Sequence, residues 1–383
     1  MASTKGNQAL VFGASGISGW AIAREAISYP TSNTFERVVG LTNRPFPRET
    51  SLFPQTARLQ VFSGVDLTKG VDAVEQALKG IEGIQGITHV YFSAYVAHDA
   101  NFPELVRANG EILKTAVLAV EKTCPNLQFW TLQTGGKGYG VEYSDKLELK
   151  APFVETLPRI PEPYASNIFY YVQQDLMKEL SAGKPWNYCE LRPDAIIGFV
   201  PNNNFMNLAQ ALGLFLSLWR SLKGPEPSVP FPGSEKAYRA LHTDTSQDIL
   251  AKAHIHTSLH PDQTQGKAFN VADGPVTSWE KVWPGVCAFF GLRGAPPAEG
   301  GLTGEKWVHS VKGEWAAWEK NNGLRGGMLE STGWGFMTAL MNMDFDRQYD
   351  LNALKSVGFK EETDTVAGYH TAFSRMKQAK FIP

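Results

Sequence analysis

Cysteine is scarce in this 383-residue sequence, and the three that occur, Cys124, Cys189 and Cys287, lie far apart in apolar surroundings. An odd number of distant cysteines does not form a disulfide framework, and their spacing fits no common metal site. We therefore expect reduced thiols packed in a core, no metal, and a cytoplasmic protein.

Neither sign of charge predominates, and no apolar run is long enough to cross a bilayer. Lys and Arg number 36 and Asp and Glu number 38, which gives a net charge of −2. Nucleic acid is therefore not an expected partner. Residues 1–6 lack the apolar region of a secretory leader, and the apolar stretch 208–219 is shorter than the ~20 residues of a membrane helix. We expect no membrane partner.

The first two hundred residues alternate between strand-like and helix-like patterns. Apolar runs predict strands at 8–13, 37–42, 58–62, 87–94, 127–133 and 187–192, and the helical period predicts helices at 18–28, 70–80, 103–123 and 166–182. Such alternation predicts an α/β fold with a doubly wound parallel sheet of the Rossmann type, in which ligands bind at the carboxyl ends of the strands.

The regular alternation ends after Pro193, and this change suggests a second, smaller lobe. We assign residues 1–200 to a Rossmann core and residues 201–240 with 291–345 to a mainly helical substrate-binding lobe. Residues 241–290 would return to the core, with strand-like character at 268–271, and 346–383 would pack on the core or the lobe. An apolar helix over 206–222 suggests core packing or a dimer face, so a homodimer stays open.

A glycine triplet directly follows the first predicted strand. Gly13 permits a sharp turn, Gly16 lets backbone N–H groups approach a pyrophosphate, and Gly19 lets the helix lie close to the strand. Ser15 and Ile17 lie between these glycines, at a helix N-terminus that favours phosphate. The turn therefore predicts a dinucleotide site.

The end of the second strand carries no acid that would hold the ribose 2′-hydroxyl of NAD. Thr42, Asn43 and Arg44 occupy that end, and a guanidinium suits a 2′-phosphate. We therefore expect NADPH as the cofactor, which makes residues 1–200 an NADP(H)-binding core. After the third strand, Asp66 and Leu67 are expected beside the adenine, where Asp66 either accepts a hydrogen bond from the adenine amino group or caps the helix that begins near Gly70.

The ends of the fourth to sixth strands should face the nicotinamide and the substrate, a small molecule. The expected cofactor contacts there are Ser93, Ala94, Tyr95, Gln133, Thr134, Pro193, Ile196 and Ile197. The expected substrate contacts are Tyr95, Phe205 and Met206, because the last two follow the strand that ends at Pro193.

Tyr171 and Lys137 are the predicted catalytic residues. Short-chain dehydrogenases usually pair a Tyr with a Lys four residues later, but the fourth residue after Tyr171 is Asp175, and the fourth after Tyr170 is Gln174. A lysine that supports the tyrosine must come from elsewhere. Lys137, in a glycine-rich turn after the fifth strand, is the best candidate.

The sequences Leu-Gln-Thr-Gly-Gly-Lys at 132–137 and Phe-Tyr-Tyr at 169–171 resemble the displaced-lysine signatures of the progesterone 5β-reductase/iridoid synthase family, an atypical extended branch of the short-chain dehydrogenases. The resemblance covers nearly the whole chain, including 88–91, 124–127, 191–193, 197–198, 206–207, 231–234, 268–271 and 380–383. It implies NADPH-dependent hydride addition to the β-carbon of an enone or enal of a small, largely apolar metabolite. Tyr171 would hydrogen-bond the carbonyl oxygen, and Lys137 would support it electrostatically.

Several positions depart from the pattern of the plant members. Gly138 follows the lysine where those commonly carry His, Gln174-Asp175 replaces an acidic pair, and Ser93-Ala94-Tyr95 stands where a Thr-Trp pair lines the pocket. A reshaped pocket suits a microbial reductase of secondary metabolism. Two alternatives stay open: a carbonyl reductase or alcohol dehydrogenase on the same scaffold, and a non-catalytic NADP-binding redox sensor, against which the Tyr–Lys pair argues.

Overall fold

A seven-stranded parallel sheet forms one half of the protein. The computed structural model describes residues 6–46, 48–98, 101–202, 204–225, 227–300 and 303–383. The strand order is β10-β6-β5-β4-β1-β2-β3, with all neighbours parallel. The strands are β1 (Asn7–Phe12), β2 (Phe35–Thr42), β3 (Leu59–Ser63), β4 (His89–Phe92), β5 (Phe129–Gln133), β6 (Asn187–Pro193) and β10 (Ala268–Val271).

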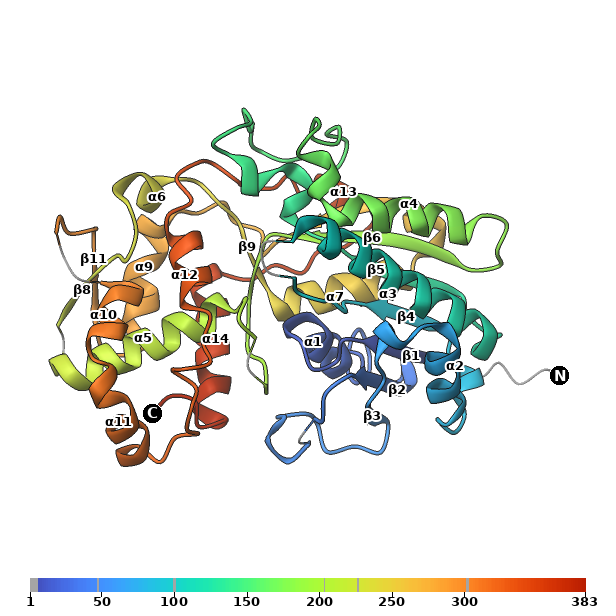
Figure 1. Cartoon of the computed structure of the whole chain (residues 1–383), viewed down its shortest axis with the longest axis horizontal. Coiled ribbons are helices and arrows are strands. Elements are labelled where there is room, and N and C mark those ends of the chain that lie inside the picture. Colours follow the sequence, from blue (N-terminus) through green and yellow to red (C-terminus); the bar gives the residue numbers. More distant parts are fainter. Residues whose placement is uncertain (1–5, 47, 99–100, 203, 226, 301–302) are drawn as a thin grey trace.

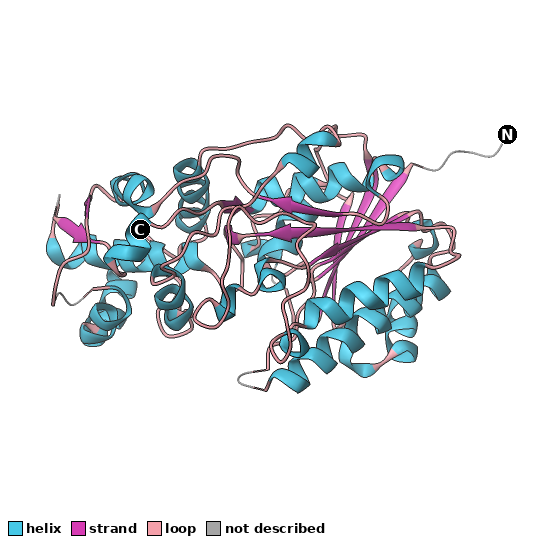
Figure 2. Cartoon of the chain, turned by 90° about the horizontal axis from the view of Figure 1, so that it is seen from above, coloured by secondary structure: helices cyan, strands magenta, loops and turns pink. Residues whose placement is uncertain are grey.

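Helices cover both faces of this sheet, as the view in Figure 2 shows. On one face α2 (Val71–Lys79), α3 (Phe102–Thr123) and α4 (Phe169–Ser181) pack in sequence. On the other face α1 (Ile17–Glu25) packs against α7 (Gln247–Ser258), which is followed by α8 (Pro261–Thr264). This doubly wound arrangement confirms the predicted Rossmann fold.

The other half of the protein is a mainly helical lobe, seen on the left of Figure 1. It contains α5 (Leu208–Lys223), α6 (Glu235–Arg239), α9 (Trp279–Ala288), α10 (Gly304–Ser310), α11 (Trp315–Asn321), α12 (Trp334–Met341) and α14 (Thr365–Gln378), with the strand pair β8 (Ser228–Pro230) and β11 (Arg293–Ala295). The pair β7 (Ala195–Ile197) and β9 (Asp244–Ser246) lies between the halves, and α13 (Asn352–Ser356) packs against β10.

The lobe shares its core with the sheet half. One buried apolar cluster includes Trp20 of α1, Leu212 of α5, Trp283 of α9 and Phe373 of α14. The predicted return segment 241–290 divides between the halves, because α7 and β10 belong to the sheet layers whereas α9 packs against β11 and α14. The lobe therefore depends on contacts between segments that are far apart in the sequence.

Two predicted helices begin later than expected. The helix expected from residue 166 begins at Phe169, after a 3-10 turn at Ala165–Asn167. The helix expected from Met206 begins at Leu208, because Asn207 is its N-cap and its side chain accepts a hydrogen bond from Gln210 N. Residues 208–219 of this helix are buried, so its apolar character reflects core packing.

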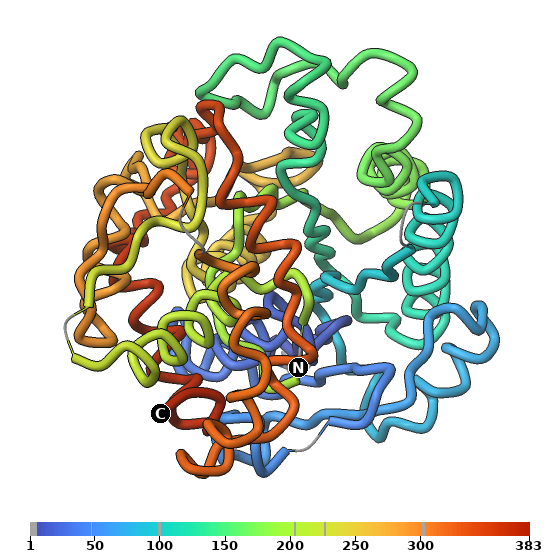
Figure 3. The backbone as a smooth tube through the Cα atoms, turned by 60° about the vertical axis from the view of Figure 1, so that its left-hand side comes forward, coloured from blue at the N-terminus to red at the C-terminus, as the bar shows by residue number. Residues whose placement is uncertain are grey.

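The three cysteines are buried and free. Among the described residues, no helix combines the length and apolar character that crossing a membrane requires. Between β5 and α4 the chain forms a long, mostly irregular segment, drawn in green at the top of Figures 1 and 3, that starts at the carboxyl end of β5. This segment carries several of the candidate site residues.

Candidate active site

The glycine turn between β1 and α1 has the geometry that the sequence predicted. Gly13 has a φ of +83°, and a Cβ atom there would lie 3.0 Å from the carbonyl carbon of Ser93 at the end of β4. A Cβ atom on Gly19 would lie 2.2 Å from Gly13 O. Both positions therefore require glycine. The glycine at 13 lets the turn approach β4, and the glycine at 19 lets α1 approach the turn.

The N-terminus of α1 opens at this turn. The first helical hydrogen bond runs from Trp20 N to Gly16 O, so the amides of Ile17 and the next two residues precede the helical ladder. Gly16 N donates to Gly13 O, which fixes the turn that contains Ser15. A turn bounded by two glycines in front of a helix N-terminus fits the pyrophosphate of a dinucleotide.

The end of β2 presents polar groups beside the glycine turn. Thr42 is buried and its hydroxyl donates to Arg44 O at 2.8 Å, whereas the side chains of Asn43 and Arg44 are exposed. Asp66 Oδ1 accepts hydrogen bonds from Thr68 N (3.0 Å) and Thr68 Oγ1 (2.7 Å), which lower the pKa of this carboxyl.

Asp66 thus has a capping role, but for the 3-10 turn Leu67–Lys69 and not for the helix near Gly70. The N-cap of α2 is Gly70 itself. The Leu67 side chain is buried in the apolar cluster beneath α2 and α3.

The residues after β4 are held by α3. Asn109 of α3 is fully buried, accepts from Val96 N (3.0 Å) and donates to Val96 O (2.8 Å). Ser93 Oγ donates to Phe12 O, which ties the end of β4 to the glycine turn. Ala94 and Tyr95 lie between these anchors and are half-buried. This stretch is therefore fixed in place beside the predicted nicotinamide position.

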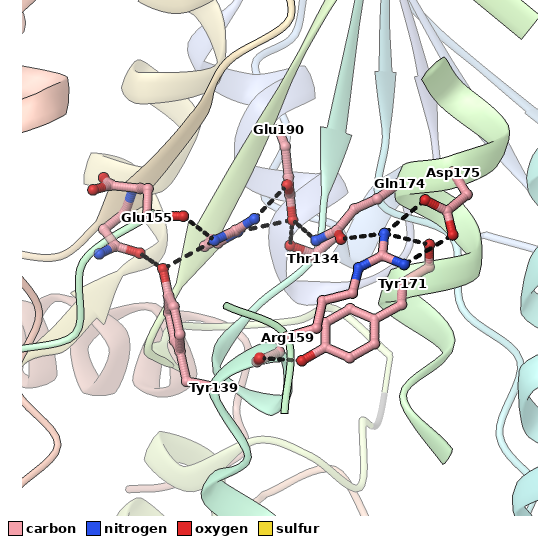
Figure 4. Close-up of polar contacts among 11 residues, drawn as sticks. Thr134, Tyr139, Glu155, Arg159, Tyr171, Gln174, Asp175 and Glu190 are labelled. Carbon is pink, nitrogen blue, oxygen red and sulfur yellow. Dashed lines mark hydrogen bonds and ion pairs between the residues drawn. The ribbon is translucent and has the colours of Figure 1, made fainter. Parts of the chain in front are cut away.

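The ends of β5 and β6 carry a polar cluster that the sequence analysis missed (Figure 4). Glu190 of β6 is buried and accepts hydrogen bonds from Thr134 Oγ1 (2.5 Å), Gln174 Nε2 (2.8 Å) and Arg192. Arg192 Nη1 also donates to Tyr139 Oη at 3.2 Å. A signal was present, because Glu and Arg two residues apart in an otherwise apolar strand indicate a paired, inward-facing charge.

Other predicted cofactor contacts lie around this cluster. Gln133 Oε1 is buried and has no hydrogen-bond partner among the described residues, so it is free to meet a ligand donor. Pro193 O accepts from Tyr349 Oη at 3.3 Å. Ile196 is half-buried, and the side chain of Ile197 lies in the apolar cluster shared with α1, so its backbone alone is available to a ligand. The unpaired acceptor of Gln133 and the glycine turn in front of α1 together fit a dinucleotide.

Tyr171 is buried, and its hydroxyl is already engaged. Tyr171 Oη donates to Gly138 O (2.7 Å) and accepts from Ile160 N (3.0 Å). The Arg159 guanidinium lies 4.7 Å from the centre of the Tyr171 ring and binds Asp175 through both carboxylate oxygens (Figure 4). Burial raises the pKa of Tyr171, whereas Ile160 N and Arg159 lower it.

Tyr170 and Lys137 both lie near Gly135, at the start of the segment that follows β5. A Cβ atom on Gly135 would lie 3.4 Å from Tyr170 Oη and 3.3 Å from Pro193 O, so the Tyr170 hydroxyl stands at the ends of β5 and β6. Lys137 Nζ forms an ion pair with Glu142 at 2.7 Å. Burial raises the pKa of Tyr170, and the Glu142 charge raises it further.

Phe205 and Met206 occupy the link between β7 and α5. Phe205 is 46% exposed, and Met206 is half-buried. Gly333 approaches the Phe205 backbone so closely that a Cβ atom there would lie 1.8 Å from Phe205 O. The link is thus held by its backbone while the Phe205 side chain stays free. No group of three or more potential metal ligands gathers within the described part of the chain.

Comparisons with known proteins identify the family of this chain. Residues 9–383 match the family described as a PRISE-like Rossmann-fold domain. The short chain dehydrogenase ausT of Aspergillus calidoustus is 36% identical to this chain, over 98% of this chain and 94% of that protein. The 3-oxo-Delta(4,5)-steroid 5-beta-reductase of Arabidopsis thaliana is 26% identical, over 98% of this chain and 93% of that protein.

The fold also occurs in solved structures of low identity. UDP-glucose 4-epimerase of Thermus thermophilus, solved as a complex with NAD, superposes with a TM-score of 0.61 at 15% identity, over 97% of this chain and 99% of that one. The family match and the full-length relatives together establish that this chain belongs to the PRISE-like Rossmann-fold family and is an oxidoreductase of the short-chain dehydrogenase type.

Proposed function

We propose that this protein is an NADPH-dependent reductase of an activated C=C bond, acting on an enone or enal of a small, largely apolar metabolite. The observation that carries the proposal is the gathering of the glycine turn, Lys137 and two tyrosines at the carboxyl ends of β1, β5 and β6. The relative named as a steroid 5-beta-reductase, aligned over 98% of this chain, supports C=C reduction as the reaction.

The cofactor would bind along the strand ends from β2 to β6. The glycine turn and the amides at the start of α1 would hold the pyrophosphate, and Arg44 would bind the 2′-phosphate, for which its exposed side chain is free. Tyr95, Gln133 and Thr134 would line the nicotinamide end. When bound, the cofactor supplies a hydride to the β-carbon of the substrate.

A hydroxyl donor is needed where charge develops on the substrate carbonyl oxygen. The sequence predicts that Tyr171 makes this hydrogen bond, and its hydroxyl would then have to break its hydrogen bond to Gly138 O. The hydroxyl of the neighbouring Tyr170 lies next to Gly135. If the Lys137 ammonium turned away from Glu142, it would stabilise negative charge at either tyrosine hydroxyl. Phe205 and Met206 would contact the apolar part of the substrate.

Isotope transfer tests the proposal. The purified protein is incubated with a panel of enones, enals and ketones and with NADPH deuterated at the transferable position. We expect deuterium on the β-carbon of a product whose carbonyl group is intact. Deuterium on a carbinol carbon would instead identify a carbonyl reductase, the second candidate, because a tyrosine hydroxyl can equally protonate an alkoxide.

A further inference from the structure

The groups that the proposed function uses stand on separate elements of the chain. Lys137 lies in the 3-10 turn Gly136–Tyr139 after β5, whereas Tyr170 and Tyr171 begin α4. When a tyrosine and a lysine stand four residues apart on one helix, the helix itself fixes their distance, because such residues share a face. Here the lysine and the tyrosines belong to different segments, so tertiary contacts must hold the turn and the helix at a fixed distance.

Glu190 of β6 contacts both of these elements. Its Oε1 accepts hydrogen bonds from Thr134 Oγ1 (2.5 Å), three residues before Lys137, and from Gln174 Nε2 of α4 (2.8 Å). The Glu190 side chain is 8% exposed, so little water competes for these hydrogen bonds. One buried carboxylate thus joins the start of the Lys137 turn to α4 (Figure 4).

Arg192 extends this contact to the other end of the Lys137 turn. Its Nε and Nη2 donate to the two carboxylate oxygens of Glu190, at 3.0 and 2.9 Å. Its Nη1 donates to Tyr139 Oη and to Glu155 O, both at 3.2 Å. Thr134 and Tyr139 lie on either side of Lys137, and both are bonded to the same ion pair, which therefore fixes the turn at its two ends.

The position of Glu190 requires a carboxylate. The hydrogen bonds from Thr134, from Gln174 and from two nitrogens of Arg192 converge on it, and an ionised carboxylate accepts all of them. An amide would turn its own N–H groups toward at least one of these donors. A buried ion pair contributes little net stability, because desolvation of the charges offsets their attraction. The fork of two bonds is nevertheless geometrically specific, so the pair suits the positioning of elements.

We propose that Glu190 and Arg192 are positioning residues that set the distance between the Lys137 turn and the tyrosines of α4. This inference rests on the proposed function for the roles of Lys137 and the tyrosines. A reacting geometry tolerates little error, since a displacement of about 1 Å caused far from the chemistry lowers a rate by about 100-fold. The pair acts through the elements that it joins and does not itself react.

Matched carboxylate-to-amide substitutions test this assignment. Glu190→Gln should lower kcat for enone reduction by about 10- to 100-fold, because the turn and the helix lose their common acceptor, while the Kd for NADPH changes less than about fivefold. Glu121→Gln is the control. Glu121 of α3 accepts from Trp186 Nε1 (3.0 Å) and pairs with Lys184 (2.9 Å) beside the amino end of β6, and its substitution should leave both values unchanged.

Amide hydrogen exchange gives a second readout, which does not depend on turnover. In Glu190→Gln we expect exchange to rise at least about fivefold in the segments 134–140 and 168–176, because both lose a contact to the carboxylate, and to stay unchanged in the other strands. Glu121→Gln should raise exchange in neither segment.

Two milder variants loosen one side each. Gln174→Leu removes one donor and keeps the ion pair, so exchange should rise in 168–176 and stay unchanged in 134–140. Arg192→Lys keeps the charge but has no planar fork of donors with which to bond Glu190 and Tyr139 together, so exchange should rise in 134–140. Each variant should lower kcat by about 3- to 30-fold. These two variants decide the assignment if Glu190→Gln does not fold.

The outcomes distinguish this inference from the proposed function. If no enone or enal is reduced, the proposed function fails, and hydrogen exchange still decides whether the ion pair holds the turn and the helix. Unchanged exchange in both segments, a rise of equal size throughout the sheet, or a normal kcat in a folded Glu190→Gln protein would each overturn the positioning role.

Discussion

At the scale of single residues, the space around each glycine decides whether the predicted cofactor turn between β1 and α1 tolerates a side chain. A Cβ atom on Gly19 would lie 2.2 Å from Gly13 O and 2.6 Å from Gly13 C, which are backbone atoms that cannot rotate away. Gly335, in contrast, has no atom within 4 Å of the position of an added Cβ and is exposed in α12.

Gly19→Ala should therefore displace α1 from the glycine turn. We expect a loss of about 1–3 kcal/mol in unfolding free energy, as for other overpacked sites, and weaker binding of both NADPH and NADH. Urea unfolding and fluorescence titration measure the two effects. The control Gly335→Ala should leave both values unchanged or slightly raise stability, and a Gly19→Ala protein with normal affinity would show that the turn does not hold the cofactor.

Arg44 offers a test of cofactor preference at the same scale. If its guanidinium binds the 2′-phosphate, Arg44→Glu removes a charge pair and adds a repulsion, and NADPH binding should weaken by about 2–4 kcal/mol while NADH binding changes little. The ratio of the two Kd values, measured by titration, reports the effect. Lys69→Glu makes the same charge change on an exposed residue of the next turn; an equal shift in both variants would contradict the assignment.

At the scale of elements, one carboxylate joins three helices from both halves of the protein. Asp248 of α7 accepts two hydrogen bonds from Arg375 of α14, at 2.9 and 2.6 Å, and forms an ion pair with Arg24 of α1 at 3.1 Å. Burial raises the pKa of Asp248, but the two arginines outweigh it and the net pKa is lowered. The carboxylate is therefore charged when these helices pack.

Asp248→Asn should loosen the contact between these helices. The amide keeps one acceptor but loses the charge, so we expect unfolding free energy at pH 7 to fall by about 1–3 kcal/mol. Because the pKa of Asp248 is lower in the folded state, its charge stabilises the folded state at pH values above the unfolded-state pKa. This stabilisation is lost as the pH falls through the folded-state pKa. The difference in unfolding free energy between variant and parent, measured by urea unfolding, should consequently shrink in acid. A difference that stays constant with pH would show that the charge of Asp248 is not its cause.

At the scale of the whole molecule, buried neutral histidines make stability depend on pH. Burial lowers the pKa of His89 and His254 to about 4 and that of His242 to about 3. The unfolded chain takes up these protons below about pH 6.5 and the folded chain does not, so stability falls as pH decreases from that point, by about 1.4 kcal/mol per pH unit for each group.

His254→Gln isolates one of these contributions. His254 is fully buried and its Nδ1 contacts Leu250 O at 2.9 Å, so the variant is less stable at pH 7.5. Between pH 7.5 and 5.0 the parent should lose about 2 kcal/mol more than the variant, because the variant has no such proton to take up. Urea unfolding at both pH values measures this, and equal losses would show that His254 is protonated in the folded state.

The succession of strands and helices, the glycine turn and the family could all be predicted from the sequence, because local periodicity, turn chemistry and motif spacing are carried by neighbouring residues. Everything that depends on distant segments meeting required the folded chain. The Glu190 cluster needs β5, β6 and α4 together, and the lobe needs α5, α9 and α14. Tyr170 and Tyr171 are equivalent in a motif, and only the rotation of α4 against the strand ends distinguishes them, since about 100° separates neighbouring side chains on a helix.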